Sequence, residues 1–143
     1  ALPAFAAVLF QCGDVNGAVD MLTEASILAV GNPIAEGAVY MFIAEHELNL
    51  GNPAKAVSWC RGAVEKLASV GASAHLAYIR VWLAEALIRA DSVEEARQEL
   101  LSALPILKAE NMIVESAQAA KLLAEIRSIF RHRLSVGLKT DLF

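Results

Sequence analysis

A pattern that recurs about every 40 residues constrains this chain more than any other feature. It places an apolar residue before an alanine at a spacing of 40 in Ile43-Ala44-Glu45, Leu83-Ala84-Glu85 and Leu123-Ala124-Glu125, and 38 residues earlier in Phe5-Ala6-Ala7. Periods of this length are typical of arrays whose units bury their apolar faces only against neighbouring units. We therefore expect a quasi-one-dimensional stack of similar units.

A second signal with the same period marks the turns. Residues 13–18, 51–56 and 91–96 each place a turn-forming residue, Gly or Asp, five residues before an alanine. Alanine recurs seven residues later, at Ala25, Ala63 and Ala103. Each unit is thus predicted to be a helix, a tight turn and a second helix, with small residues where the backbones cross closely. The predicted crossing residues are Ala6, Ala44, Ala84 and Ala124 on first helices and Ala18, Ala56 and Ala96 on second helices.

The amino-acid composition and the motifs typical of helix N-termini predict an all-α fold. The chain has 27 Ala and 19 Leu against 8 Gly and 4 Pro, and no segment alternates with period two. Asn32-Pro33 and Asn52-Pro53 are typical helix starts, and Ser92 and Glu95 form a potential capping box. Pro105 is expected to bend its helix or to loosen the last turn. The predicted helices are 2–12, 15–30, 33–50, 53–70, 73–90, 92–109 and 112–131. They form repeats 2–30, 33–70 and 73–109, a final helix 112–131 and a C-terminal tail 132–143.

These residues resemble the tetratricopeptide repeats. That family combines a large-then-small pair in the first helix with a Gly-Asp-type turn and spaced alanines in the second, as in Gly13-Asp14 with Ala18 and Ala25. Asp91 replaces the turn glycine in the third unit. The period of 38 to 40 exceeds the usual 34, so the match is similar to the longer repeats of MalT-type bacterial regulators. The resemblance covers residues 1–131 and implies a right-handed solenoid of antiparallel helix pairs.

In such arrays the first helix of each pair lines a concave groove that holds a partner. Carried over by register, the resemblance implies groove residues Met41, Glu45, Leu48, Asn49, Tyr78, Val81, Glu85, Arg89, Lys121 and Glu125. Glu45, Glu85 and Glu125 then form an acidic ladder suited to a basic partner. The alternative is that these glutamates are ordinary solvated helix residues. Trp59 and Trp82 either anchor a partner or pack between helices.

No catalytic residue, metal site or cofactor is expected. Glu45-His46-Glu47 are consecutive and point about 100° apart, while His75 and His132 do not belong to a metal-binding motif. Ser58-Trp59-Cys60 lie within a predicted helix without a nucleophile elbow. The two cysteines are far apart and lack metal-ligand spacing, which favours a reducing, cytoplasmic location.

The distribution of charge along the chain indicates which classes of binding partner are expected. The net charge of −4 disfavours nucleic acid and anionic membranes, and the uncharged stretch 1–13 is too short to span a bilayer and has no basic leader. Residues 121–143 carry five Lys or Arg against two acidic residues. Apolar residues of the tail are expected either to cap the last layer or to occupy the groove of another copy.

The amino-terminal helix is uncharged, so Leu9 and Phe10 are candidates for self-association as a homodimer. The chain begins at Ala1, which suggests a fragment of a larger bacterial regulatory or signalling protein. The expected function is a non-catalytic protein-protein interaction scaffold. The alternatives are an effector-sensing domain that binds a small ligand or peptide in the groove of a transcriptional regulator and, less favoured, a helical enzyme domain.

Overall fold

Helices joined by short turns make up the part of the chain that the structure describes. A computed structural model describes residues 15–141 of the 143. Within that range the elements are α2 (Val15–Ala29), α3 (Pro33–Asn49), α4 (Pro53–Ala68), α5 (Ser73–Arg89), α6 (Val93–Ala109) and α7 (Ile113–Asp141), with no strand among them. The expected all-α class is thereby confirmed for the described residues. The predicted helix 2–12 lies outside them.

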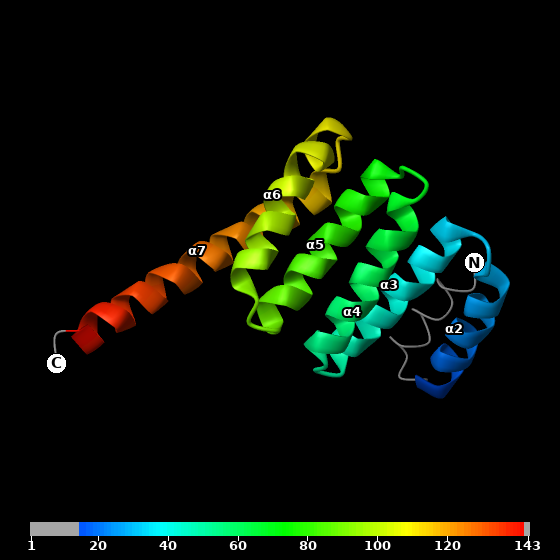
Figure 1. Ribbon diagram of the computed structural model, residues 1–143, viewed down its shortest axis with the longest axis horizontal. Coiled ribbons are helices and arrows are strands. Elements are labelled where there is room, and N and C mark those ends of the chain that lie inside the picture. The colour runs from blue at the N-terminus through cyan, green and yellow to red at the C-terminus, as the bar shows by residue number, and fades with distance from the viewer. Residues whose placement is uncertain (1–14, 142–143) are drawn as a thin grey trace.

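The helices pack in chain order, each against the next, and successive helices run in opposite directions (Figure 1). The contacts between α3 and α4 and between α5 and α6 are the most extensive, and α5 also contacts α7. Connections of three or four residues between successive helices keep sequence neighbours adjacent in space. The molecule is therefore a row of helices in which α3 and α5, and then α5 and α7, flank a shared face.

A residue with a left-handed backbone conformation follows the end of each successive helix, and these residues are spaced 20 apart. They are Gly31, Gly51, Gly71, Asp91 and Asn111, with φ between 55° and 84°. After α5, the Ser92 N–H donates to Leu87 O at 2.8 Å and the Asp91 N–H to Ile88 O at 3.1 Å. This pair of bonds is a Schellman motif, which satisfies the last carbonyls of the helix and needs a residue with positive φ. The 40-residue period thus divides into two 20-residue helix-and-turn halves.

Only one of the three predicted N-caps uses its side chain. Asn32 Oδ1 accepts from the Ala35 N–H at 3.2 Å, as expected. The Asn52 side chain makes no cap bond, and its Nδ2 donates to Glu47 Oε2 at 2.9 Å. The capping box is wrong as well: Ser92 makes no cap bond and Glu95 pairs with Arg61 on α4. Tertiary ion pairing outcompetes the local motif there. The helix also continues past Pro105 to Ala109.

The periodic alanines lie where helices cross, with one exception. Ala44, Ala84, Ala56 and Ala96 are at most 1% exposed. Ala124 is exposed, contrary to its predicted role, because no described helix packs against α7 in the way that α6 packs against α5. The crossings predicted at Ala6 and Ala18 fall outside the residues whose side chains are described.

The last helix is longer than predicted. It was expected to end at 131 and to be followed by a tail, but α7 continues to Asp141. Arg133, within the continuation, pairs with Asp91 at the end of α5. The continuation extends away from the other helices (Figure 1), and Leu134 and Val136 are 69% and 48% exposed. The prediction that tail residues cap the last layer is therefore wrong for these two side chains.

Candidate functional site

The face flanked by α3, α5 and α7 carries two hollows, and we call it the odd-helix face. The first, the α3–α5 hollow, has a volume of about 220 Å³. Ten residues line it: Ile34, Ala38, Met41, Phe42, Glu45, Leu67, His75, Tyr78, Ile79 and Trp82. An apolar cavity of about 150 Å³ holds benzene, so this hollow has room for one ring or one long side chain.

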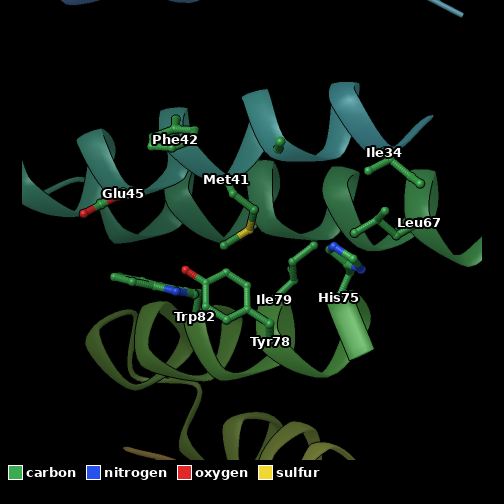
Figure 2. Close-up of a pocket in the computed structure, with 10 residues that line it drawn as sticks. Ile34, Met41, Phe42, Glu45, Leu67, His75, Tyr78, Ile79 and Trp82 are labelled. Carbon is green, nitrogen blue, oxygen red and sulfur yellow. The ribbon is translucent and has the colours of Figure 1, made fainter. Parts of the chain in front are cut away.

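Aromatic and thioether groups form the middle of the α3–α5 hollow. Tyr78 and Trp82, one turn apart on α5, lie side by side and face Met41 on α3 (Figure 2). Tyr78 is 38% exposed although its surroundings are apolar. Glu45 and His75 lie at opposite ends of the hollow (Figure 2). The site therefore presents apolar walls with one polar group at each end.

Helical periodicity explains this arrangement. Residues 34, 38, 41, 42 and 45 follow one face of α3, and residues 75, 78, 79 and 82 follow one face of α5. Spacings of three and four residues return a side chain to the same side of a helix. Leu67 of α4, which is 2% exposed, joins the lining from between the two helices.

Glu45 is in an electrostatically unfavourable position. Glu45 is exposed, but partial desolvation by its neighbours, and then the carboxylate of Glu85 on α5, raise the pKa of Glu45 above its ordinary value. Glu45 has no ion-pair partner among the described residues. Its negative charge thus remains uncompensated at one end of an apolar hollow.

A second hollow of about 210 Å³, the α5–α7 hollow, continues the odd-helix face. Its lining is more polar and consists of Glu85, Ile88, Arg89, Gln118, Lys121, Leu122 and Glu125. Arg89 Nη2 pairs with Glu85 Oε1 at 3.2 Å, and Arg89 Nη1 donates to Leu48 O at 3.5 Å. Arg89 therefore links the end of α3 to α5 and offsets the charge of Glu85.

Seven of the ten predicted groove residues line these hollows. Met41, Glu45 and Tyr78 line the first, whereas Glu85, Arg89, Lys121 and Glu125 line the second. Leu48 and Val81 were wrongly placed on the surface, since they are 5% and 1% exposed and belong to the core. Asn49 is exposed at the end of α3 and lines neither hollow. The self-association candidates Leu9 and Phe10 lie outside the described residues.

Sequence reasoning missed several lining residues. His75 is assigned no binding role by the sequence, yet it lines the α3–α5 hollow from the third residue of α5. Phe42 and Ile34 carry no sequence prediction, and for Trp82 both partner anchoring and packing between helices are open. The stripe that His75 forms with Tyr78 and Trp82, at spacings of three and four, is the signal that identifies them. Trp59 does pack between helices, with its ring 5.2 Å from that of Tyr40.

A third hollow, of about 280 Å³, lies between α6 and α7. Apolar side chains including Leu101, Leu104, Leu123 and Phe130 line it, with Arg97 and Arg127 among them. Leu101 is 45% exposed. We call this region the α6–α7 hollow.

The described residues contain no group of three or more His, Cys, Asp or Glu side chains arranged to hold a metal ion. Cys60 is completely buried, and burial raises its pKa to about 12. Such a thiol remains protonated and unreactive at neutral pH. None of the described helices is long and apolar enough to cross a membrane.

Comparisons of the chain with protein-family models, with curated proteins and with solved structures found no match.

Proposed function

We propose that this chain is a non-catalytic protein-protein interaction scaffold, a right-handed solenoid paired like the tetratricopeptide repeats, and that its odd-helix face binds a protein or peptide. In this proposal it serves as the partner-binding part of a larger cytoplasmic regulatory or signalling protein. The observation that carries the proposal is the α3–α5 hollow, in which Tyr78 and Trp82 remain accessible beside Met41.

Two features support a peptide as the ligand. The first hollow is apolar and accommodates one large side chain, whereas the second is lined by charged groups. Both lie along the same row of helices, so an extended segment placed across α5 contacts an apolar anchor site and a polar site in turn. Binding energy in such interfaces is concentrated in aromatic anchors surrounded by polar contacts.

The second candidate is an effector-sensing domain that binds a small ligand in the α3–α5 hollow. Glu45 and His75 at its two ends favour this alternative, because small-molecule sites combine apolar walls with a few polar groups. The volume of about 220 Å³ is below the roughly 300 Å³ at which such pockets begin. We therefore place peptide binding first.

Selection from a random peptide library tests the proposal. Peptides of 12 residues would be selected on the immobilised 143-residue chain, and the affinity of each would be measured by fluorescence anisotropy for wild type, Tyr78→Ala and Leu101→Ala. The expected result is an affinity loss of roughly tenfold for Tyr78→Ala, the scale of a truncated aromatic anchor.

Leu101→Ala is the matched control, because Leu101 is comparably exposed and lines the α6–α7 hollow instead. Peptides that lose affinity only with Leu101→Ala, or with neither variant, would contradict the proposed binding face. Circular dichroism on both variants would establish that the fold is retained.

A further inference from the structure

We propose that the α3–α5 hollow binds a basic side chain, Lys or Arg, of the partner protein, with the aliphatic stem on Met41, Tyr78 and Trp82 and the cationic group at Glu45. The inference rests on the proposed function and names the chemistry of the partner at that site.

The three glutamates of the predicted ladder are not equivalent, and their differences point to Glu45. Glu85 is paired with Arg89. Glu125 lies with Lys121 in the α5–α7 hollow. Glu45 has no cationic partner among the described residues and lies near Glu85, whose charge acts on it. A site for an added positive charge therefore exists at the Glu45 end of the first hollow.

The charged groups around Glu45 leave that position open. The facing helix α5 carries two arginines. The Arg89 guanidinium is already engaged by Glu85 and by the carbonyl of Leu48, and Arg80 pairs with Glu99 of α6. His75 lies at the other end of the hollow from Glu45 (Figure 2). A partner's ammonium or guanidinium group would thus meet the Glu45 carboxylate without displacing an existing ion pair.

The walls of the hollow suit the stem of such a side chain. Lys and Arg bury their methylene groups along apolar surface and keep the charged end at a polar position. Tyr78 and Trp82 lie side by side, and a cation beside aromatic faces gains attraction from the rings. The raised pKa of Glu45 agrees with such a site, since partial desolvation and the charge of Glu85 both disfavour the Glu45 carboxylate and a bound cation would offset the repulsion from Glu85.

The n-butylammonium ion, which reproduces the Lys side chain from Cβ onward, is a direct probe. Its binding to the 143-residue chain would be followed by NMR and compared with n-butanol, a neutral molecule of the same length. The chain has two tryptophans. The indole N–H of Trp82 reports on the hollow, and that of Trp59, which packs against Tyr40, serves as an internal reference.

We expect n-butylammonium to shift the Trp82 signal saturably and to bind about two- to fivefold more tightly than n-butanol, the range expected for an exposed cation site. Glu45→Gln should abolish that preference. Glu65→Gln should preserve it, because Glu65 is an exposed glutamate of α4 that lines none of the three hollows. Equal binding of the two probes to wild type, or an unchanged preference in Glu45→Gln, would overturn the inference.

Library-selected peptides separate this inference from the proposed function. In peptides whose binding depends on Tyr78, replacement of each Lys or Arg by norleucine should weaken binding at one position in wild type but not in Glu45→Gln. Tyr78-dependent peptides that tolerate every such replacement would refute the basic side chain while leaving the binding face intact. Glu45-dependent binding of n-butylammonium without any Tyr78-dependent peptide would instead refute the peptide-binding function.

Discussion

Arg133 on α7 pairs with Asp91, which lies two residues after the end of α5 and has a φ of +62°. Four other helix ends in the described part of the chain have positive φ, at Gly31, Gly51, Gly71 and Asn111. Asp91 therefore combines an unfavourable backbone conformation with an ion pair to a residue 42 positions later. The pair attaches the projecting part of α7 to the turn between α5 and α6.

Asp91→Gly should raise the free energy of unfolding by about 0.5 kcal/mol. A non-glycine residue in the left-handed region costs roughly 1 kcal/mol, whereas an exposed ion pair contributes about 0.2–1 kcal/mol. Arg133→Ala removes the same pair without relieving the backbone and should lower stability by about 0.2–1 kcal/mol. Urea denaturation of both variants measures the difference, and effects of the same sign would contradict this account.

Amide hydrogen exchange should reveal how the pair holds α7. Residues 131–137 should exchange faster in both Asp91→Gly and Arg133→Ala, because helix ends without tertiary contacts open most readily. Arg127→Ala is a suitable control, since Arg127 lies on the same helix at the α6–α7 hollow and does not pair with Asp91. Unchanged exchange at 131–137 would show that α7 persists independently of Asp91.

Leucine substitutions at two equivalent repeat positions should differ in their effect on the free energy of unfolding. Ala84 is completely buried between helices, so Ala84→Leu should destabilise the chain by about 1–3 kcal/mol through overpacking. Ala124 has the same register 40 residues later but is exposed, so Ala124→Leu should change stability by less than about 0.5 kcal/mol. Thermal unfolding of the pair distinguishes them, and comparable losses would mean that a further surface covers α7.

The thiol of Cys60 should be inert in the folded chain. With a pKa of about 12, roughly 10⁻⁴ of it is ionised at pH 8. In a Cys12→Ser background, a disulfide reagent such as DTNB should react with Cys60 only after denaturant is added. Rapid labelling without denaturant would show that α4 opens easily.

Glu45 should make stability depend on pH. Because burial and Glu85 raise its pKa, the folded chain binds a proton at Glu45 more readily than the unfolded chain does. Stability therefore falls as pH rises from the ordinary value of 4.5 through the raised pKa. Glu45→Gln should raise the melting temperature at pH 7.5 and leave it nearly unchanged at pH 3.5, as measured by circular dichroism.

Two checks accompany the pH experiment. Glu65→Gln should show no comparable difference between the two pH values. NMR titration of Glu85→Gln should give a lower pKa for Glu45 than wild type, because one of its two causes has been removed. A Glu45 pKa that is unaffected by Glu85→Gln would assign the whole effect to burial.

Local sequence determined where the helices are and how they end. Strong helix formers, prolines at first helical positions and turn residues repeated every 20 residues act within a few positions of themselves, so the predicted bounds of α3 to α6 agree with the structure to within two residues. The same register identified seven residues that line the odd-helix face, because helical periodicity fixes which side chains share a side.

Only the tertiary structure decided what each side chain meets. Leu48 and Val81 have the register of surface residues but are buried by neighbouring helices, and Ala124 has the register of a crossing residue but no described helix packs against it. Glu95 forms an ion pair with Arg61 instead of the predicted capping box. The last helix α7 continues beyond residue 131, and Arg133 in this continuation forms an ion pair with Asp91. Burial and ion pairing depend on residues dozens of positions away, and a periodic pattern carries no information about which of those partners is present.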